Sequence, residues 1–209
     1  MRSLAICLAF ALSLAATLSL APASADEPPQ RSAAELMDAV MWGKEPIGGP
    51  FALTDHTGKP RTDADFRGKL MLVYFGFTSC PDICPTDLQA MGLAIDRLGE
   101  AGEAVQPLFV TLDPERDTRE VLAEYVPMFH PRMLGLRGDG PALRAAARAF
   151  RVYFNAVKTG EADGYTVDHS AFVYLMNRDG GYLGFFPPGT SAERMAASIK
   201  PHLAASVKR

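Results

Sequence analysis

The sequence predicts an α/β domain in which helices flank a mixed β-sheet. Two runs, 70–77 and 106–112, are mostly apolar, as in strands that a sheet buries on both faces. Apolar residues at helical spacing follow each run. Near the C-terminus, two apolar segments flank a glycine turn and precede one more helical segment. Strands that alternate with helices and then end in a hairpin are typical of a mixed sheet.

The composition restricts the classes of protein to consider. The chain has 209 residues, of which 48% are hydrophobic and 22% charged, and its formal net charge is −3. This length suits one domain, and the apolar fraction excludes a wholly disordered chain. There is no basic excess to indicate a nucleic-acid ligand. Three cysteines are too few for a disulfide framework.

The elements are expected in a definite order. The pattern predicts two helical turns at 35–42, a hairpin extension around 51–60, strands at 70–77 and 106–112 with a helix between them to about 98, a helix at 117–129, a strand at 133–136, a helix at 141–150, strands at 170–176 and 182–186, and a helix at 190–205. Asp117 with Glu120, and Thr190 with Glu193, resemble capping boxes that open their helices. Pro127 predicts that its helix ends or bends early.

The N-terminus resembles a targeting segment. Arg2 precedes an uncharged run, 4–20, and small residues end at Ala25, a pattern typical of a secretory signal peptide. The alternative is a membrane anchor formed by residues 4–22. We therefore expect residues 1–25 to be a leader or anchor and residues 26–43 a flexible lead-in. The mature protein is expected in the periplasm, either soluble or anchored to the inner membrane, and the folded domain should span 44–205.

Two cysteines remain once the leader, which contains Cys7, is set aside. Cys80 and Cys84 follow a buried strand and precede a helix, a position that favours the thiolate. Residues four apart on a helical turn face the same way. Three interpretations stay open: a structural disulfide, a redox-active dithiol, or a soft-metal site for copper or zinc. A metal site would need a third ligand from elsewhere in the chain.

The four histidines are the candidates for that ligand. His56 falls in the predicted hairpin turn and His202 near the end of the last helix. His130 lies among methionines, and His169 lies where a polar loop enters an apolar strand. From spacing alone, His169 could be either a ligand or a histidine that is hydrogen-bonded at a strand edge.

Five motifs together resemble the Sco/SenC family of cytochrome c oxidase assembly proteins. They are Val73-Tyr74-Phe75-Gly76-Phe77-Thr78, Cys80-Pro81-Asp82-Ile83-Cys84-Pro85, Asp113-Pro114-Glu115-Arg116-Asp117, Phe129-His130-Pro131-Arg132 and Val167-Asp168-His169-Ser170. The resemblance implies a thioredoxin-like fold and copper, Cu(I) or Cu(II), bound by Cys80, Cys84 and His169. It also implies delivery of copper to the dinuclear centre of oxidase subunit II, reduction of that centre's cysteines, or both. Asp113 and Asp117 are candidates to act behind the ligands, although Asp117 could simply cap its helix.

The function predicted on this basis is that of a copper chaperone. Copper binding requires both cysteines to be reduced and deprotonated, so formation of a Cys80–Cys84 disulfide would expel the metal. The alternative is a thiol–disulfide oxidoreductase that acts through a mixed disulfide. A peroxidase on the same fold is disfavoured, because residues 70–77 contain no proline. Expected partners are subunit II or another copper acceptor, an upstream copper donor and a thioredoxin-like reductant.

Overall fold

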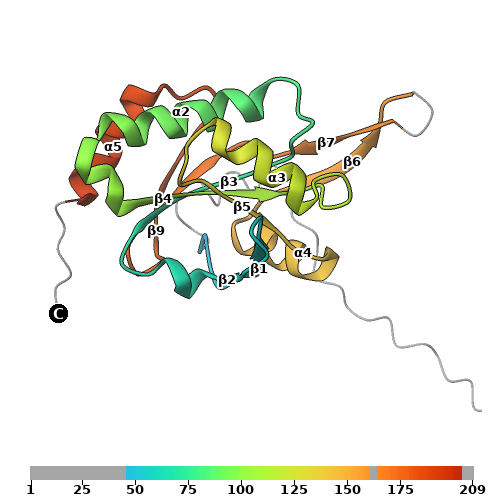
Figure 1. Cartoon of the computed structure of the whole chain (residues 1–209), viewed down its shortest axis with the longest axis horizontal. Coiled ribbons are helices and arrows are strands. Elements are labelled where there is room, and N and C mark those ends of the chain that lie inside the picture. The colour runs from blue at the N-terminus through green and yellow to red at the C-terminus, as the bar shows by residue number, and fades with distance from the viewer. Residues whose placement is uncertain (1–45, 161–163, 204–209) are drawn as a thin grey trace, which may run out of the picture. The chain divides into compact units, whose positions relative to one another are not determined.

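A mixed sheet forms the centre of the structure (Figure 1), a computed structural model that describes residues 46–160 and 164–203. Its seven strands lie in the order β2-β1-β5-β4-β3-β8-β9. The strands are β1 (Ala52–Asp55), β2 (Pro60–Thr62), β3 (Leu70–Gly76), β4 (Val105–Thr111), β5 (Leu134–Arg137), β8 (Val173–Met176) and β9 (Tyr182–Phe186). The predicted α/β class, mixed sheet and N-terminal hairpin are confirmed. The leader 1–25, the lead-in 26–43 and the turns at 35–42 lie outside the described residues.

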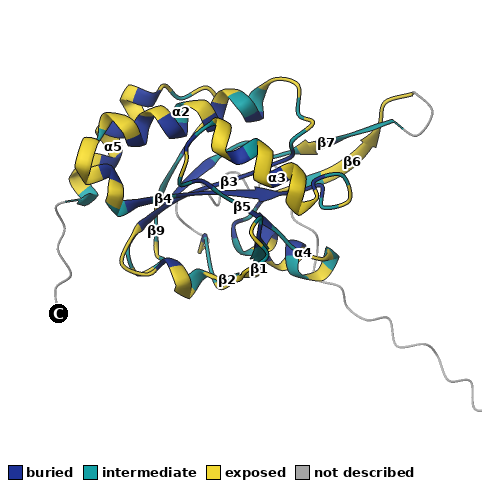
Figure 2. Ribbon diagram, in the orientation of Figure 1, coloured by how far each residue is buried: buried dark blue, intermediate teal, exposed yellow. Residues whose placement is uncertain are grey.

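Four α-helices cover the sheet within the described part of the chain. They are α2 (Ile83–Arg97), α3 (Arg119–Tyr125), α4 (Gly140–Ala149) and α5 (Ala192–Leu203), with short 3-10 helices η1 (Asp63–Phe66), η2 (Gly99–Ala104) and η3 (Val126–Met128) between elements. The helices α2 and α5 pack together. Figure 1 shows α2, α3 and α5 on one side of the sheet and α4 on the other. This layering buries β3 along its whole length (Figure 2).

Parallel pairing of the central strands brings two functional segments to one edge of the sheet. The strand β3 is parallel to β4, and Gly76 is paired with Thr111 at the carboxyl ends of the two strands. The Leu112 N–H donates to the Gly76 carbonyl at 2.7 Å. The cysteine segment leaves β3 at this edge, and the segment 113–117 leaves β4 beside it. The sheet therefore places these segments side by side.

A two-stranded hairpin projects from the domain and was not predicted. It consists of β6 (Phe154–Lys158) and β7 (Tyr165–His169), which pair only with each other. Figures 1 and 2 show it extending away from the sheet, with β6 largely exposed. The available signal was the alternation of Tyr165 and Val167 with Thr166 and Asp168 in β7, whereas the largely exposed β6 shows no regular alternation. The predicted strand at 170–176 is correspondingly shorter, because β8 begins at Val173.

The helix predicted to begin at Asp117 is capped by another residue. The N-cap of α3 is Thr118, whose hydroxyl accepts a hydrogen bond from the Val121 N–H. The Asp117 side chain is fully buried and points elsewhere. The capping-box interpretation of Asp117 is therefore wrong, because the helix begins after it. Asp117 is free for the network described below.

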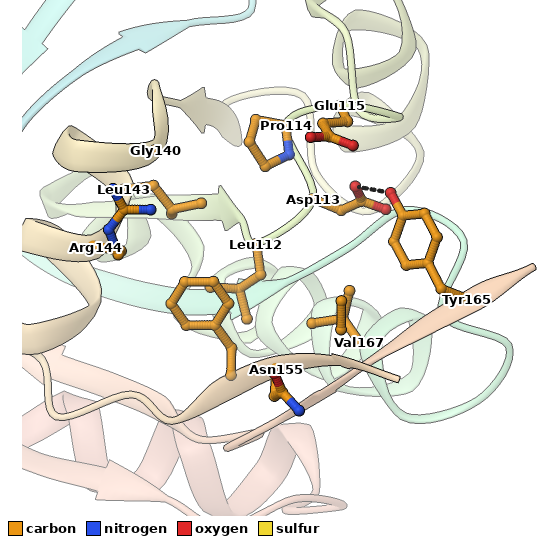
Figure 3. A pocket seen from close by; sticks show the side chains of 12 residues that line it. Leu112, Asp113, Pro114, Glu115, Gly140, Leu143, Arg144, Asn155, Tyr165 and Val167 are labelled. Carbon is orange, nitrogen blue, oxygen red and sulfur yellow. Dashed lines mark hydrogen bonds between the residues drawn. The ribbon is translucent and has the colours of Figure 1, made fainter. Parts of the chain in front are cut away.

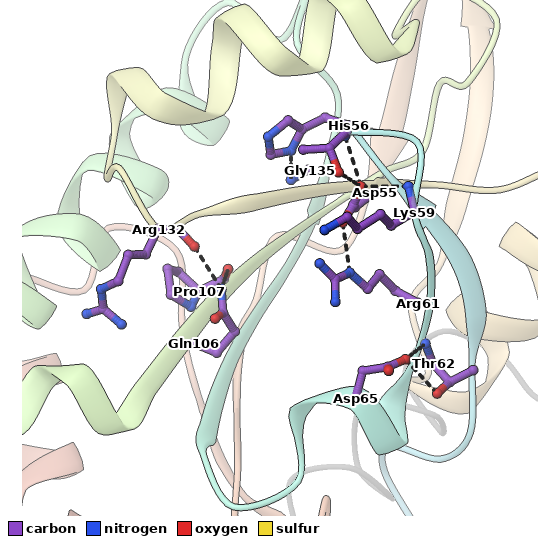
Figure 4. A network of polar contacts seen from close by, with 11 residues as sticks. Asp55, His56, Lys59, Arg61, Thr62, Asp65, Gln106, Pro107, Arg132 and Gly135 are labelled. Carbon is purple, nitrogen blue, oxygen red and sulfur yellow. Dashed lines mark hydrogen bonds and ion pairs between the residues drawn. The ribbon is translucent and has the colours of Figure 1, made fainter.

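A buried carboxylate closes the turn of the N-terminal hairpin (Figure 4). Asp55 is 0% exposed and accepts hydrogen bonds from Thr57, the Lys59 N–H and Arg61 Nε. Burial is the largest single influence on its pKa and raises it. The hydrogen bonds from Thr57, Arg61 and Lys59 together outweigh burial and lower the pKa to about 2.

Acid should therefore weaken the fold through Asp55. A folded-state pKa below the unfolded one gives stability that is present above the unfolded pKa and lost as pH falls through the folded pKa. We expect the loss of about 2 kcal/mol between about pH 5 and about pH 2. Urea unfolding across this range should show that slope in the native chain and not in Asp55→Asn. An identical acid dependence in the two proteins would contradict the prediction.

Candidate metal centre

The cysteine pair and His169 meet at the edge of the sheet, although they lie far apart in sequence. Cys84 is in the first turn of α2, and Cys80 is in the loop that joins β3 to α2. His169 is the last residue of β7. Its Nε2 atom lies 3.3 Å from the Cys84 Sγ atom, across 85 positions of the chain. Of the three predicted ligands, the structure thus brings Cys84 and His169 into direct contact.

Aromatic and glycine residues shape the pocket around this contact. The His169 ring lies edge-on to Phe77 and Tyr74, with ring centroids 5.7 and 6.5 Å away. Cys84 is fully buried. A Cβ atom at Gly76 would lie 2.9 Å from the Cys84 Sγ atom, so glycine leaves the room that the sulfur occupies. The sulfur and the imidazole consequently face each other beside two aromatic rings.

The two thiols differ in acidity. The hydrogen bond with Cys84 is the largest influence on Cys80 and lowers its pKa to about 5, with help from the backbone at Asp82 and Cys84, against an opposing effect of burial. The same hydrogen bond, together with burial, raises the pKa of Cys84. At neutral pH, the Cys80 thiolate therefore accepts a hydrogen bond from the Cys84 thiol. The pair loses its first proton easily and its second with difficulty.

Selective alkylation should reveal this difference. In the reduced chain we expect iodoacetamide to modify Cys80 with a half-maximal rate at a pH of about 5, because the thiolate is the nucleophile. Cys84 should react only after unfolding. Mass spectrometry of quenched samples measures both rates, and Cys84→Ala should move the Cys80 profile toward about 8.5. A profile for the native chain centred near the ordinary thiol value would contradict the prediction.

Two further polar groups are buried behind Cys84. Burial raises the pKa of Tyr74, and the nearby Cys84 and Asp87 add to the effect. The Asp87 Oδ1 atom accepts from the Gly189 N–H at 2.8 Å, and burial raises the pKa of this carboxyl. Neither the Tyr74 hydroxyl nor Asp87 Oδ2 has a partner with good hydrogen-bond geometry among the described residues. The buried side of the site therefore contains polar groups as well as aromatic rings.

Asp117 connects the cysteine loop to the adjacent strand. Its carboxylate accepts hydrogen bonds from the Thr78 N–H at 3.1 Å and the Thr78 hydroxyl at 2.5 Å. It also accepts from the Thr111 hydroxyl at 2.5 Å. Thr78 precedes Cys80 by two positions. Asp117 therefore fixes the start of the loop that carries the first thiol.

Asp113 connects the same segment to the His169 hairpin. Its carboxylate forms an ion pair with Arg116 and accepts a hydrogen bond from the Tyr165 hydroxyl at 2.7 Å. Tyr165 begins the strand that ends at His169. The sequence indicated Asp113 and Asp117 as residues that act behind the ligands, but did not single out Arg116, Tyr165 or Thr78. The motif 113–117 was the available signal for Arg116.

The donors present suit a soft metal, although they are not gathered into a closed cluster. Among the described residues, no group of three or more His, Cys, Asp or Glu side chains is positioned to hold a metal ion. Two sulfurs and an imidazole are the donor types that favour Cu(I) or Zn(II) over hard cations. His130 is engaged elsewhere, because its Nδ1 accepts from the Arg132 N–H at 3.1 Å. Cys80, Cys84 and His169 thus fit a copper ion chemically, and their role as its ligands remains a prediction.

The fold and site define a class of protein: a thioredoxin-like domain with a dithiol at a helix N-terminus and a histidine opposite it. Comparison with known proteins narrows the class. The SCO1/SenC family model matches residues 40–204. The chain is 46% identical over 159 residues to the human "Protein SCO2 homolog, mitochondrial", covering 75% of this chain and 60% of that protein. The chain belongs to the SCO1/SenC family.

Solved structures agree with this assignment. Bradyrhizobium japonicum ScoI with copper bound has a TM-score of 0.70 and 40% identity, over 75% of this chain and 99% of that one. Yeast Sco1 with copper bound has a TM-score of 0.70 and 39% identity, over 78% of this chain and 92% of that one. The predicted thioredoxin-like fold is confirmed. Copper as the family's metal is confirmed too, since homologous Sco structures are solved with copper bound.

The expected periplasmic location is wrong. The curated relatives that match include mammalian SCO1 and SCO2 homologs named as mitochondrial proteins. The expectation depended on residues 1–25, whose basic start and apolar run indicate membrane targeting without distinguishing one membrane from another. No helix within 46–160 or 164–203 is long and apolar enough to cross a membrane. The chain spans about 60% of the length of the first curated relatives it matches.

Proposed function

We propose that this chain binds copper through Cys80, Cys84 and His169 and delivers it during assembly of cytochrome c oxidase. The observation that carries the proposal is the 3.3 Å contact between Cys84 Sγ and His169 Nε2. Relatives of this chain are solved with copper bound, which supports copper as the cargo. The dinuclear copper centre of oxidase subunit II is the acceptor that fits this role.

The chemistry of the donors suits a carrier that must release its cargo. Two thiolates and one imidazole bind copper tightly and leave room for a ligand from an acceptor. Copper can then pass by exchange of one ligand at a time without being free in solution. The Cys80 thiolate is partly exposed, whereas Cys84 is buried. Cys80 is thus the donor that an acceptor reaches first.

The redox state of the thiols controls loading. Binding requires deprotonation of both thiols, and copper replaces the proton that they share. Oxidation to a Cys80–Cys84 disulfide removes both sulfur donors at once and would release the metal. A reductant of the thioredoxin type, and an upstream copper donor that supplies the reduced chain, follow as partners.

A second candidate function is reduction of disulfides in the acceptor. It is favoured by the unequal thiols, because a partly exposed cysteine with a pKa of about 5 can attack a disulfide. Its buried neighbour can then resolve the mixed disulfide, which leaves Cys80–Cys84 oxidised and two acceptor thiols reduced. This activity does not require His169. The histidine therefore distinguishes the two functions.

Anaerobic titration of the reduced chain with Cu(I), against a competing chelator, tests the proposal. We expect the chain to bind one Cu(I) ion tightly. A parallel titration with Cu(II) measures the affinity for the other oxidation state. His169→Ala should weaken binding by more than about 100-fold, since replacing groups behind a metal ligand already costs about 10- to 100-fold.

The matched control is His202→Ala on α5, which should bind as the native chain does. His169→Ala should keep its ability to form the Cys80–Cys84 disulfide, so that thiol titration shows the dithiol to be intact. Copper affinity that His169→Ala leaves unchanged would remove His169 from the site. A chain that binds no copper but reduces disulfides would establish the second function instead.

A further inference from the structure

The hairpin that carries His169 has few attachments to the domain. Its strands β6 and β7 pair with each other and with no strand of the main sheet. A cavity of about 530 Å³ lies between the inner face of the hairpin and the domain, lined among others by Leu112, Leu143 and Val167 (Figure 3). Side-chain packing is therefore incomplete beneath the hairpin. Besides the hydrogen bonds between Ser170 and Tyr153 at its base, contacts at the edges of this cavity hold the hairpin that carries His169.

Arg116 makes several of these contacts with one side chain. Its Nε atom forms an ion pair with Asp113, and Nη1 donates to the Tyr165 carbonyl at 2.9 Å. Its guanidinium carbon lies 3.8 Å from the centroid of the Tyr165 ring and 5.9 Å from that of Phe77. The Tyr165 hydroxyl donates to the same Asp113 carboxylate, as Figure 3 shows. The backbone and the ring of Tyr165 are thus both held by one ion pair.

The adjacent residue holds the other half of the site. Asp117 accepts hydrogen bonds from the N–H and hydroxyl of Thr78, two positions before Cys80. Arg116 and Asp117 thereby connect the end of β4 to both segments that bear the predicted ligands. Any change at Arg116 that frees β7 would leave the cysteine loop attached through Asp117. The two halves of the site can consequently be separated by experiment.

Stability alone does not account for an arginine at this position. The Arg116 Nη2 atom is buried and has no hydrogen-bond partner among the described residues, and burying an unpartnered donor is destabilising. A lysine could form the ion pair with Asp113. It could not also present a planar group to the Tyr165 ring while donating to the Tyr165 carbonyl. The planar guanidinium group is therefore required for both contacts with Tyr165.

We propose that Arg116 is a positioning residue that holds the β6–β7 hairpin against the domain and keeps His169 within reach of Cys84. The proposal rests on the proposed function, in which these residues bind copper. Arg116 itself is no ligand, and it acts through Tyr165 and the strand that leads to His169. It should therefore affect copper affinity while leaving both thiols in place and able to form a disulfide.

Arg116→Lys and Arg116→Gln test the proposal, with Arg97→Gln as the matched control. Arg97 forms a surface ion pair with Glu193 on the elements α2 and α5. Hydrogen exchange of the copper-free chain at residues 165–169 should be about 10-fold faster in both Arg116 variants and unchanged in the control. Cu(I) affinity should fall by about 10- to 100-fold, the usual effect of removing a group that orients a ligand. The ability to form the Cys80–Cys84 disulfide should stay as in the native chain.

The lysine variant keeps a positive charge beside Asp113, so it can still be measured if the glutamine variant does not fold. Unchanged exchange at 165–169 in the lysine variant would overturn the proposal, whatever the copper affinity. Faster exchange with native copper affinity would also overturn it, because the hairpin would then not determine the site. Failure of the native chain to bind copper would instead overturn the proposed function, and exchange in the copper-free variants would still decide whether Arg116 holds the hairpin.

Discussion

Replacement of Asp117 with alanine should lower the free energy of unfolding by about 3 kcal/mol, because it leaves buried donors without an acceptor. The carboxylate accepts hydrogen bonds from the N–H and hydroxyl of Thr78 and from the hydroxyl of Thr111. Asp117 and Thr111 are both fully buried, so water does not replace the lost partner. Urea-induced unfolding at neutral pH measures the loss.

Asp117→Asn is the matched control for this prediction. The amide keeps the shape of the side chain and one acceptor oxygen, so its effect should be about half that of alanine. The alanine variant should also bind Cu(I) about 10-fold more weakly, because Thr78 would no longer hold the loop before Cys80. An alanine variant that unfolds at the native urea concentration would show that the network contributes nothing to stability.

Replacement of Gly92 with alanine should destabilise the fold by about 3 kcal/mol, near the upper end for overpacking in a dense interior. A Cβ atom built at this position lies 2.1 Å from the carbonyl oxygen of Phe129 and 3.1 Å from its carbonyl carbon. Both are backbone atoms, so no side chain can rotate to make room. The helix α2 must move away from the segment after η3, or that segment must shift.

Helix propensity alone predicts that Gly92→Ala would raise the free energy of unfolding. In a helix interior, alanine is more favourable than glycine by about 1 kcal/mol. Gly184→Ala on β9 is the control, because a Cβ atom there meets nothing within 4 Å and the change should stay within about 1 kcal/mol. Thermal and urea unfolding of both variants measure the effects. A Gly92→Ala variant more stable than the native chain would show that propensity outweighs the contact.

The sequence correctly predicts which strands of the sheet are buried. The apolar runs at 70–77 and 106–112 correspond to β3 and β4, and the cysteines do lie between a buried strand and a helix. Such features depend on residues close together in the chain, where periodicity and apolar content directly report which face is buried. The hairpin β6–β7 was not predicted, because its residues produce only a weak pattern. The strand β6 is largely exposed and shows no regular alternation, and the alternation in β7 is confined to a few residues.

The candidate ligands also differ in how far the sequence alone identifies them. The pair Cys80 and Cys84 stands out by spacing alone, whereas spacing left the role of His169 open and the family resemblance indicated it as a ligand. Its contact with Cys84 arises because β3 lies next to β8 in the sheet and His169 lies only four positions before the first residue of β8. For Asp117, a local pattern predicted a helix cap, and this was wrong because its carboxylate accepts hydrogen bonds from Thr78 and Thr111 instead.

The sequence by itself determined the α/β class, the order of the main elements and the thiol pair. Only the tertiary structure decided how these parts meet: the Cys84–His169 contact, the attachment of the hairpin through Arg116 and the close approach at Gly92. The physical reason is that periodicity records the burial of one element at a time. Contacts between distant segments depend instead on the order of strands and on polar groups that find partners only after the sheet has formed.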